Sequence, residues 1–198
     1  MFWDKIAGVY DLVERTYNGK ANRGAIRIVS DLMDPEDNVL ECACGTGMFS
    51  EEIAPKCKKL TATDLSSKML KRAEKKCRKY DNCSFEFADI TSLQYADNSF
   101  DKVVAANVIH LLDDPQAAMK EFSRIVKPGG EIIIPTYINK SKVSANKAAT
   151  LFNKMGAGFK RQFDEETYKE FFAKLGYEGA EYIVAGGRMP CDVAVIRI

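Results

Sequence analysis

Between residues 38 and 135 the chain alternates short apolar segments with longer segments of helical character, and this rhythm restricts the fold more than any other feature. The apolar segments that read as strands are 38–42, 59–63, 84–88, 100–106 and 131–135. Helices are expected between them, up to about Pro55, from a Ser66 cap to about Tyr80, and over 116–126, with a Pro128-Gly129-Gly130 turn before the last strand. Strands that alternate with helices at this spacing predict an α/β fold, a doubly wound parallel sheet with helices on both faces.

The C-terminal part of the chain departs from this rhythm. Asp164 can cap a helix that runs to Leu175 and stops at Gly176. Two strands follow, over 180–185 and 191–198, joined by a short turn around Gly186-Gly187. So few residues cannot form a crossover connection, so these two strands must be antiparallel. The sequence therefore predicts a mostly parallel sheet that ends in an antiparallel C-terminal hairpin.

Two parts of the chain lie outside the alternation. Residues 4–16 and 21–33 show the apolar spacing of two amphipathic helices. Residues 136–163 are too many for an ordinary connection and are expected to form helices. Three large apolar residues of this segment fall at helical spacing: Phe152, Met155 and Phe159. They could wall an apolar substrate, pack into the core, or belong to a mobile lid hinged at Gly156 and Gly158.

Composition places the chain among ordinary globular domains. With 198 residues, of which 46% are apolar and 29% charged, it is expected to form one domain with a sizeable core. Lys and Arg number 29 against 28 Asp and Glu, a formal net charge of +1. Proteins that bind nucleic acid through phosphates usually carry a clear basic excess, so no nucleic-acid partner is expected. The basic run over 71–79 then reads as a solvated helix face.

Apolar run length and cysteine usage bear on where the protein works. Its apolar runs fall far short of the about 20 residues that a membrane span needs, and the N-terminus lacks the pattern of a signal peptide. The six cysteines form no repeated C-x-x-C pair, and a single histidine is available to join them on a metal. Cys42 and Cys44 are therefore interpreted as buried thiols at a strand end, with no metal site. The expectation is a cytoplasmic protein with reduced cysteines and no membrane span.

Polar groups stand at the ends of four consecutive predicted strands. The first strand carries Glu41 and runs into Cys44-Gly45-Thr46-Gly47, whose glycines allow a tight turn and a close approach to a ligand. The second ends at Asp64, 23 residues after Glu41, near the spacing of about 20 at which an acid meets ribose hydroxyls in dinucleotide folds. Asp89 and Asn107 follow the third and fourth strands. Because the carboxyl ends of parallel strands share one edge, these groups predict a single site for a nucleotide-like ligand.

In series, these segments resemble the class I S-adenosylmethionine-dependent methyltransferases, and most of all their small-molecule branch of the ubiquinone and menaquinone biosynthesis type. The matching pieces cover nearly the whole chain: Tyr10-Asp11, Val39 to Gly47, Asp64-Leu65-Ser66 with Met69-Leu70 and Ala73, Phe87-Ala88-Asp89, Phe100-Asp101, His110-Leu111, Asp114-Pro115 and Val126 to Gly130. The resemblance implies a Rossmann-like, seven-stranded sheet of order 3-2-1-4-5-7-6. It also implies one domain over 1–198, with a helical cap over 1–36 and a substrate-side insertion over 136–163.

The resemblance also assigns cofactor-binding roles, with S-adenosyl-L-methionine as cofactor and S-adenosyl-L-homocysteine as product. It implies an acid near the methionine portion, glycines under the cofactor, acids for the ribose hydroxyls and the adenine amino group, apolar contacts to the ring and an amide near the sulfonium. The residues concerned are Glu41, Ala43, Gly45, Thr46, Gly47, Asp64, Leu65, Met69, Asp89, Ile90 and Asn107. Two of them depart from the family pattern, since Ala43 replaces its first glycine and Glu41 replaces the commoner aspartate.

Two residues are candidates for a catalytic role. His110, the single histidine, could serve as a general base or a substrate contact, or could be purely structural. Tyr10 could touch cofactor or substrate, or pack with its hydroxyl at the surface. Methyl transfer from a sulfonium depends on alignment more than on proton removal, so an enzyme of this kind can work without a base.

The sequence thus predicts methyl transfer to the O, N, C or S atom of a small-molecule acceptor, by a monomer or homodimer. An NAD(P)-dependent oxidoreductase is the first alternative, although Ser50 stands where its motif expects a third small Gly or Ala. A non-catalytic protein that binds S-adenosylmethionine is the second. The fold by itself does not separate these functions.

Overall fold

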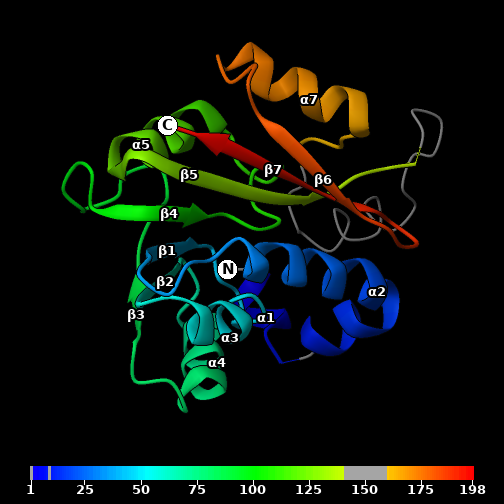
Figure 1. The fold of residues 1–198 in the computed structure, drawn as a ribbon. Coiled ribbons are helices and arrows are strands. Elements are labelled where there is room, and N and C mark those ends of the chain that lie inside the picture. The colour runs from blue at the N-terminus through cyan, green and yellow to red at the C-terminus, as the bar shows by residue number, and fades with distance from the viewer. Residues whose placement is uncertain (1, 9, 141–159) are drawn as a thin grey trace.

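The computed structural model describes residues 2–8, 10–140 and 160–198, and these build one seven-stranded sheet of order β3-β2-β1-β4-β5-β7-β6 (Figure 1). The strands are β1 (Asn38–Cys42), β2 (Lys59–Asp64), β3 (Cys83–Phe87), β4 (Phe100–Val104), β5 (Val126–Tyr137), β6 (Glu181–Ala185) and β7 (Cys191–Arg197). The predicted strand order is confirmed.

The directions of the strands also match the prediction. β1 pairs in parallel with β2 on one side and with β4 on the other, so that Leu40 lies opposite Thr61 and Val103. β3 and β5 extend the parallel part, and β7 joins β5 antiparallel before β6 returns against it. The carboxyl ends of β1 to β4 therefore open on one edge of the sheet.

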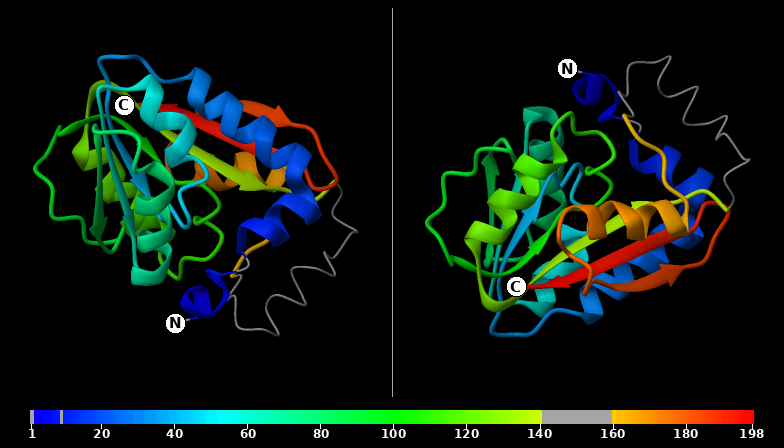
Figure 2. Two further views of the ribbon diagram at one scale, coloured as in Figure 1. Left: turned by 90° about the horizontal axis from the view of Figure 1, so that it is seen from below. Right: turned by 90° about the horizontal axis from the view of Figure 1, so that it is seen from above.

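Helices cover both faces of the sheet, and Figure 2 shows the two helix layers from opposite sides. On one face lie α2 (Tyr10–Asp31), α3 (Ser50–Ile53) and α4 (Ser67–Cys77). On the other lie α5 (Pro115–Ile125) and α7 (Glu165–Lys174). Successive strand residues face opposite layers, so Val39 packs in the α2 layer and Leu40 in the α5 layer, both fully buried.

The predicted helix caps are present. The Ser66 hydroxyl accepts a hydrogen bond from the Met69 backbone and begins α4. Asp164 and Thr167 form a reciprocal capping box at the start of α7, and Gly176, with φ of +90°, follows its end. The helix α4 ends at Cys77, about one turn earlier than expected.

The N-terminal helices differ from the prediction of helices over 4–16 and 21–33. The structure has a short α1 (Phe2–Ile6) and a long α2 that continues through Asn18, where the backbone leaves helical geometry (φ −139°, ψ 26°). The Asn18 amide donates to the Met189 carbonyl at 2.8 Å and accepts from the Met189 backbone at 3.1 Å. This long-range pair between α2 and the β6–β7 turn stabilises a kink where the apolar pattern alone indicated a break.

Strand β5 is longer than expected, because Pro128-Gly129-Gly130 lies inside it and is not a separate turn before it. The pairing with β4 shifts register between Phe100 and Lys102, as in a β-bulge. Gly130 passes so close to β4 that an added Cβ would lie 2.5 Å from the Asp101 carbonyl oxygen. Only glycine fits this approach, so the motif shapes the strand pairing.

Other expectations concern membrane spans, metal clusters, cysteines and the predicted insertion. No helix in the described residues is long and apolar enough to cross a membrane, and these residues hold no cluster of His, Cys, Asp and Glu suited to a metal. All six cysteines are free thiols. Residues 136–140 and 160–163 are the two described ends of the predicted 136–163 insertion, and Ile138 forms an isolated bridge with Phe163 between them. The helices expected between them, with Phe152, Met155 and Phe159, lie outside the described residues.

Candidate functional site

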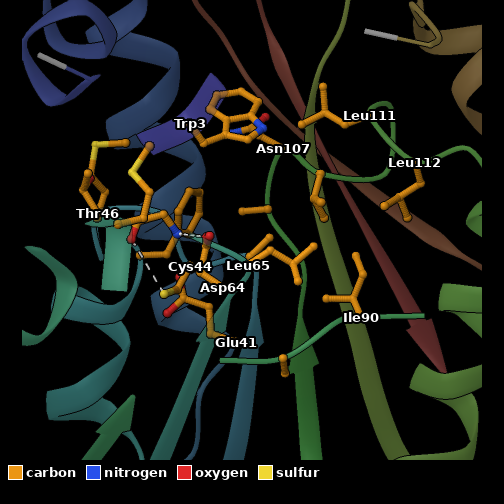
Figure 3. Close-up of a pocket in the computed structure, with 18 of the residues that line it drawn as sticks. Trp3, Glu41, Cys44, Thr46, Asp64, Leu65, Ile90, Asn107, Leu111 and Leu112 are labelled. Atoms are coloured by element: carbon orange, nitrogen blue, oxygen red, sulfur yellow. Dashed lines mark hydrogen bonds between the residues drawn. The ribbon is translucent and has the colours of Figure 1, made fainter. Parts of the chain in front are cut away.

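A pocket of about 300 Å³ opens at the carboxyl ends of the parallel strands (Figure 3). That volume lies at the lower end of the range of small-molecule sites. All but one of the residues predicted to bind a cofactor line this pocket. They are Glu41, Ala43, Gly45, Thr46, Asp64, Leu65, Met69, Asp89, Ile90 and Asn107. The fold therefore brings together side chains that stand up to 66 positions apart in the sequence, from Glu41 to Asn107.

The exception is Gly47, which packs behind the turn. Gly45 and Gly47 both have positive φ, +57° and +78°. An added Cβ on Gly47 would lie 2.9 Å from both Cα and Cβ of Ala73 in α4, whereas one on Gly45 would have no atom within 4 Å. Gly47 thus lets the turn pack against α4, and Gly45 leaves space on the side of the pocket.

Ala43 has a backbone conformation that explains the glycine of the family pattern. Its φ is +54°, in the left-handed region that is costly for a residue with a Cβ. Asn107, which follows the neighbouring strand β4, has φ of +52°. Both residues line the pocket, and strained backbone of this kind clusters at ligand sites.

Asp64 joins the ends of β1 and β2. Its Oδ2 accepts a hydrogen bond from the Gly45 backbone at 2.9 Å, and its Oδ1 accepts one from the Ser66 backbone at 2.7 Å. An ionised carboxylate has about four acceptor positions, so Asp64 retains capacity for the hydroxyls of a ligand. Burial raises the pKa of Asp64, while these backbone hydrogen bonds favour its ionised form.

Glu41 is the most deeply buried acid of the pocket, with 1% of its surface exposed. The Ser50 hydroxyl donates a hydrogen bond to its Oε2 at 2.5 Å. Burial raises the pKa of Glu41 to about 8, and the nearby Asp64 charge acts in the same direction. A carboxyl in this state is readily ionised by a positively charged ligand.

Asp89, Asn107 and the apolar residues complete the side walls. Asp89 Oδ1 accepts from the backbone and the hydroxyl of Thr91, at 2.9 and 2.7 Å, which orients the carboxylate. Asn107 Oδ1 accepts from the Tyr137 backbone at 3.3 Å, which ties the end of β4 to β5. Ile90 is buried and Leu65 is 39% exposed, so an apolar surface lies between the acids.

The two catalytic candidates are placed differently. His110 is buried and is not among the pocket-lining residues, and burial lowers the pKa of its imidazole to about 4. The ring is therefore neutral at physiological pH, and its position favours the structural interpretation over a catalytic one. Tyr10 begins α2, and its side chain lies outside the described part of the chain. Their catalytic roles stay predictions.

The sequence analysis missed a group of apolar residues that line the pocket: Trp3, Met48, Phe49, Val108, Leu111 and Leu112. In Figure 3, Trp3 and Leu111 lie at one end of the pocket and Glu41 at the other. Val108 and the two leucines follow Asn107 closely in the sequence, so their closeness to a predicted site residue could have indicated that they line the pocket. Trp3 is the single tryptophan of the chain and comes from α1, and nothing local in the sequence indicates that it reaches the sheet edge.

The polar groups that line the pocket fit S-adenosylmethionine. Three carboxyl groups, of Glu41, Asp64 and Asp89, suit a ligand with a positive sulfonium, an amino group and vicinal hydroxyls. The described lining residues include no Lys, Arg or His, which suits a ligand without phosphate groups. The open space at Gly45 leaves room beside these groups.

Comparison with known proteins finds methyltransferases. A family model described as "Methyltransferase domain" matches residues 40–134, which contain the turn, both aspartates and Asn107. A demethylmenaquinone methyltransferase of Paenarthrobacter aurescens is 34% identical over 137 residues, 68% of this chain and 53% of that protein. A ubiquinone/menaquinone biosynthesis C-methyltransferase (UbiE) of Bdellovibrio bacteriovorus is 40% identical over 105 residues, 50% of this chain and 43% of that protein. The chain spans about half the length of the curated relatives it matches.

Solved structures share the fold over the full chain. A SAM-dependent methyltransferase of Thermotoga maritima, described as a possible histamine N-methyltransferase, gives a TM-score of 0.75 at 20% identity and covers 99% of both chains. The DhpI–SAH complex gives a TM-score of 0.75 at 19% identity, over 99% of this chain and 94% of that one. With the matched domain, the sequence relatives and the strand order in agreement, the chain belongs to the class I S-adenosylmethionine-dependent methyltransferase family.

Proposed function

We propose that the protein transfers a methyl group from S-adenosylmethionine to a small-molecule acceptor and releases S-adenosylhomocysteine. The observation that carries this proposal is the convergence of Glu41, Asp64, Asp89 and Asn107 from successive strand ends on one pocket. The matched methyltransferase domain, which contains all four residues, supports it.

In this proposal, each strand end holds a different part of the cofactor. Asp64 uses its remaining acceptor positions for the ribose hydroxyls, with Gly45 and Ser66 keeping its carboxylate in place. Asp89 accepts from the adenine amino group, and Leu65 and Ile90 contact the ring. Glu41 offsets the positive charge of the methionine portion from the floor of the pocket.

When bound, S-adenosylmethionine supplies a methyl group on a positively charged sulfur. The contribution of the chain is to exclude water and to align the acceptor with that methyl group. Asn107, fixed by its hydrogen bond with the Tyr137 backbone, is proposed to orient the reacting groups at the end of β4. The described pocket residues provide no imidazole or amine as a general base, which agrees with a reaction that depends on alignment.

Calorimetric titration with S-adenosylmethionine and, separately, with NADH tests the cofactor assignment. We expect the wild type to bind S-adenosylmethionine in the micromolar range and not NADH. Asp64→Asn keeps one carbonyl oxygen but loses the charge and half of the acceptor capacity, so its affinity is expected to fall about tenfold or more. Asp81→Asn, at an exposed surface position away from the pocket, is the matched control and is expected to bind like the wild type.

Release of S-adenosylhomocysteine with a panel of small acceptors then tests the reaction. NADH binding without S-adenosylmethionine binding would favour the oxidoreductase alternative. Tight cofactor binding without turnover on any acceptor would favour the non-catalytic one. Equal affinities of the wild type and Asp64→Asn would refute the site assignment, whatever the cofactor.

The assembly and location of the protein are also proposals. We propose a monomer or homodimer that acts in the cytoplasm and has no nucleic-acid partner. The balanced charge and the free thiols support this proposal. Sedimentation analysis and a polyanion-binding assay at physiological salt are the tests, and a larger oligomer or specific nucleic-acid binding would contradict it.

A further inference from the structure

Trp3 lines the end of the pocket opposite to Glu41, the end at which Asn107 also lies (Figure 3). It lines the pocket together with Val108, Leu111 and Leu112, which belong to the segment after β4. Figure 3 draws Trp3 and Leu111 at the end opposite to Glu41. This end therefore presents a flat indole and branched aliphatic side chains, whereas the carboxyl groups of Glu41, Asp64 and Asp89 line other parts of the pocket.

Trp3 is held there by its neighbour in α1. The Ser66 hydroxyl donates a hydrogen bond to Asp4 Oδ1 at 2.5 Å and accepts one from the Met69 backbone at 3.2 Å. Ser66 is fully buried at the start of α4, and its backbone N–H donates to Asp64. The chain Asp4–Ser66–Asp64 thus connects α1 to the cofactor edge of the sheet, and α1 packs directly against α4.

The charges around the pocket restrict what can enter. The described lining residues include three carboxyl groups, of Glu41, Asp64 and Asp89, and no Lys, Arg or His to offset a negative ligand. The one other ionisable group is the thiol of Cys44, whose pKa is raised by burial. An anionic acceptor would be repelled by the partly buried carboxylate of Asp64, whose charge is screened less than that of the exposed Asp89. A neutral ring system meets no such repulsion and can stack on the indole face.

Given the function proposed above, on which this inference rests, we propose that Trp3 is a specificity-determining residue. It forms the acceptor-side wall of the pocket, is positioned by the Asp4–Ser66 hydrogen bond, and selects an uncharged, planar acceptor. Asp4 is a positioning residue in this arrangement, since it acts through the placement of α1.

Calorimetric binding of paired probes tests the selectivity. 2-Naphthol is planar and uncharged at pH 7, 2-naphthoate has the same ring system with a carboxylate, and decahydro-2-naphthol is uncharged but not planar. We expect 2-naphthol to bind the wild type about tenfold tighter than either analogue. Trp3→Ala is expected to lose about tenfold in 2-naphthol affinity, and Trp3→Phe to retain most of it, because a flat ring remains.

S-adenosylhomocysteine binding, measured on the same samples, separates this inference from the proposed function. Trp3→Ala is expected to bind S-adenosylhomocysteine within about twofold of the wild type, which also shows that the variant is folded. If the wild type does not bind S-adenosylhomocysteine but binds 2-naphthol in a way that depends on Trp3, the proposed function is refuted, whereas the role of Trp3 as a wall of the pocket is not. Equal 2-naphthol affinity of wild type and Trp3→Ala, or tighter binding of 2-naphthoate, would overturn the inference.

The single tryptophan provides an independent test of the positioning contact. Asp4→Ala removes the acceptor for the Ser66 hydroxyl, so the indole is expected to become more accessible, with the acrylamide quenching constant rising about twofold. The affinity for 2-naphthol is expected to fall in parallel. Asp31→Ala, which changes an exposed aspartate at the end of α2, is the matched control. Unchanged quenching and unchanged 2-naphthol affinity in Asp4→Ala would refute the role of the hydrogen bond.

Discussion

The Ser50 hydroxyl donates a hydrogen bond to the buried carboxyl of Glu41 at 2.5 Å, on the floor of the pocket. This contact links the end of β1 to the start of α3, and it is one of few compensations for a carboxyl removed from water. Burial raises the pKa of Glu41 to about 8, so most of the free protein carries a protonated Glu41 at pH 7. A positive ligand reverses this preference, which makes cofactor binding depend on pH.

We therefore predict that the affinity for S-adenosylmethionine rises with pH up to about 8 and then levels off. Below this pKa the cation must first remove a proton from Glu41, so each pH unit changes the affinity by up to about tenfold. S-adenosylhomocysteine, which has no charge on sulfur, should show a smaller dependence. Calorimetry in buffers of different ionisation heat at pH 7 should reveal proton release on binding. Glu41→Gln should remove both effects, and a wild-type affinity that does not vary with pH would contradict the prediction.

The two glycines of the β1–α3 turn should respond differently to alanine. Gly47→Ala brings a Cβ to 2.9 Å from the Ala73 backbone at φ +78°, so we expect a loss of about 2–4 kcal/mol in the free energy of unfolding. Gly45→Ala has strain at φ +57° but no clash, and should lose about 1 kcal/mol. Its methyl group enters the pocket side, so its affinity for S-adenosylmethionine should fall roughly tenfold. Denaturant unfolding and calorimetry on both variants test this, and equal stabilities would contradict it.

Ala43→Gly should be tolerated or slightly stabilising. Its φ of +54° costs an alanine about 1 kcal/mol, and glycine removes that strain while gaining unfolded-state entropy of similar size. Ala106 also lines the pocket but does not have positive φ, so Ala106→Gly should lose about 0.5–1 kcal/mol. Thermal unfolding of the two variants provides the comparison. A destabilisation by Ala43→Gly as large as that by Ala106→Gly would show that the backbone at Ala43 is not strained.

Asp192, buried in β7 on the α7 side of the sheet, should make stability depend on pH. Neither carboxylate oxygen accepts a hydrogen bond of ordinary geometry from the described residues, and burial raises its pKa to about 6, with Lys169 opposing and Glu165 reinforcing the shift. The folded state then holds a proton that the unfolded state releases near pH 4, so stability falls as pH rises from about 4 to about 6 and stays lower above that.

Asp192→Asn should remove this penalty. We expect it to be more stable than the wild type by about 1–3 kcal/mol at pH 8 and nearly equal to it at pH 4. Denaturant unfolding across this pH range is the measurement, with the exposed Asp81→Asn as control. A stability difference that does not change with pH would mean that Asp192 does not titrate between these limits.

Local chemistry was sufficient to predict most of the sheet and the polar part of the site. Ser66, Asp164 and Gly176 mark helix ends through contacts with residues at most three positions away, or through φ alone, so the sequence shows them directly. Asp64 and Asp89 could be assigned because parallel strands place their carboxyl ends on one edge. The strand order itself came from the family resemblance, and the structure confirms it.

Features that depend on distant contacts were missed or misplaced. The kink of α2 at Asn18 depends on Met189, and the need for glycine at position 130 in β5 depends on the carbonyl of Asp101. No local pattern contains these partners. The burial of His110 away from the pocket lining follows in the same way from how the segment after β4 packs.

By itself, the sequence determined the alternation of strands and helices, the antiparallel C-terminal hairpin and the acids at the strand ends, because spacing and backbone preference are properties of short segments. The tertiary structure decided which groups share the pocket and in what state. Trp3 lines the pocket from a helix whose Asp4 accepts a hydrogen bond from Ser66, 62 positions away. Glu41 holds its proton only because other elements bury it, and burial is a property of the packed chain that no residue has alone.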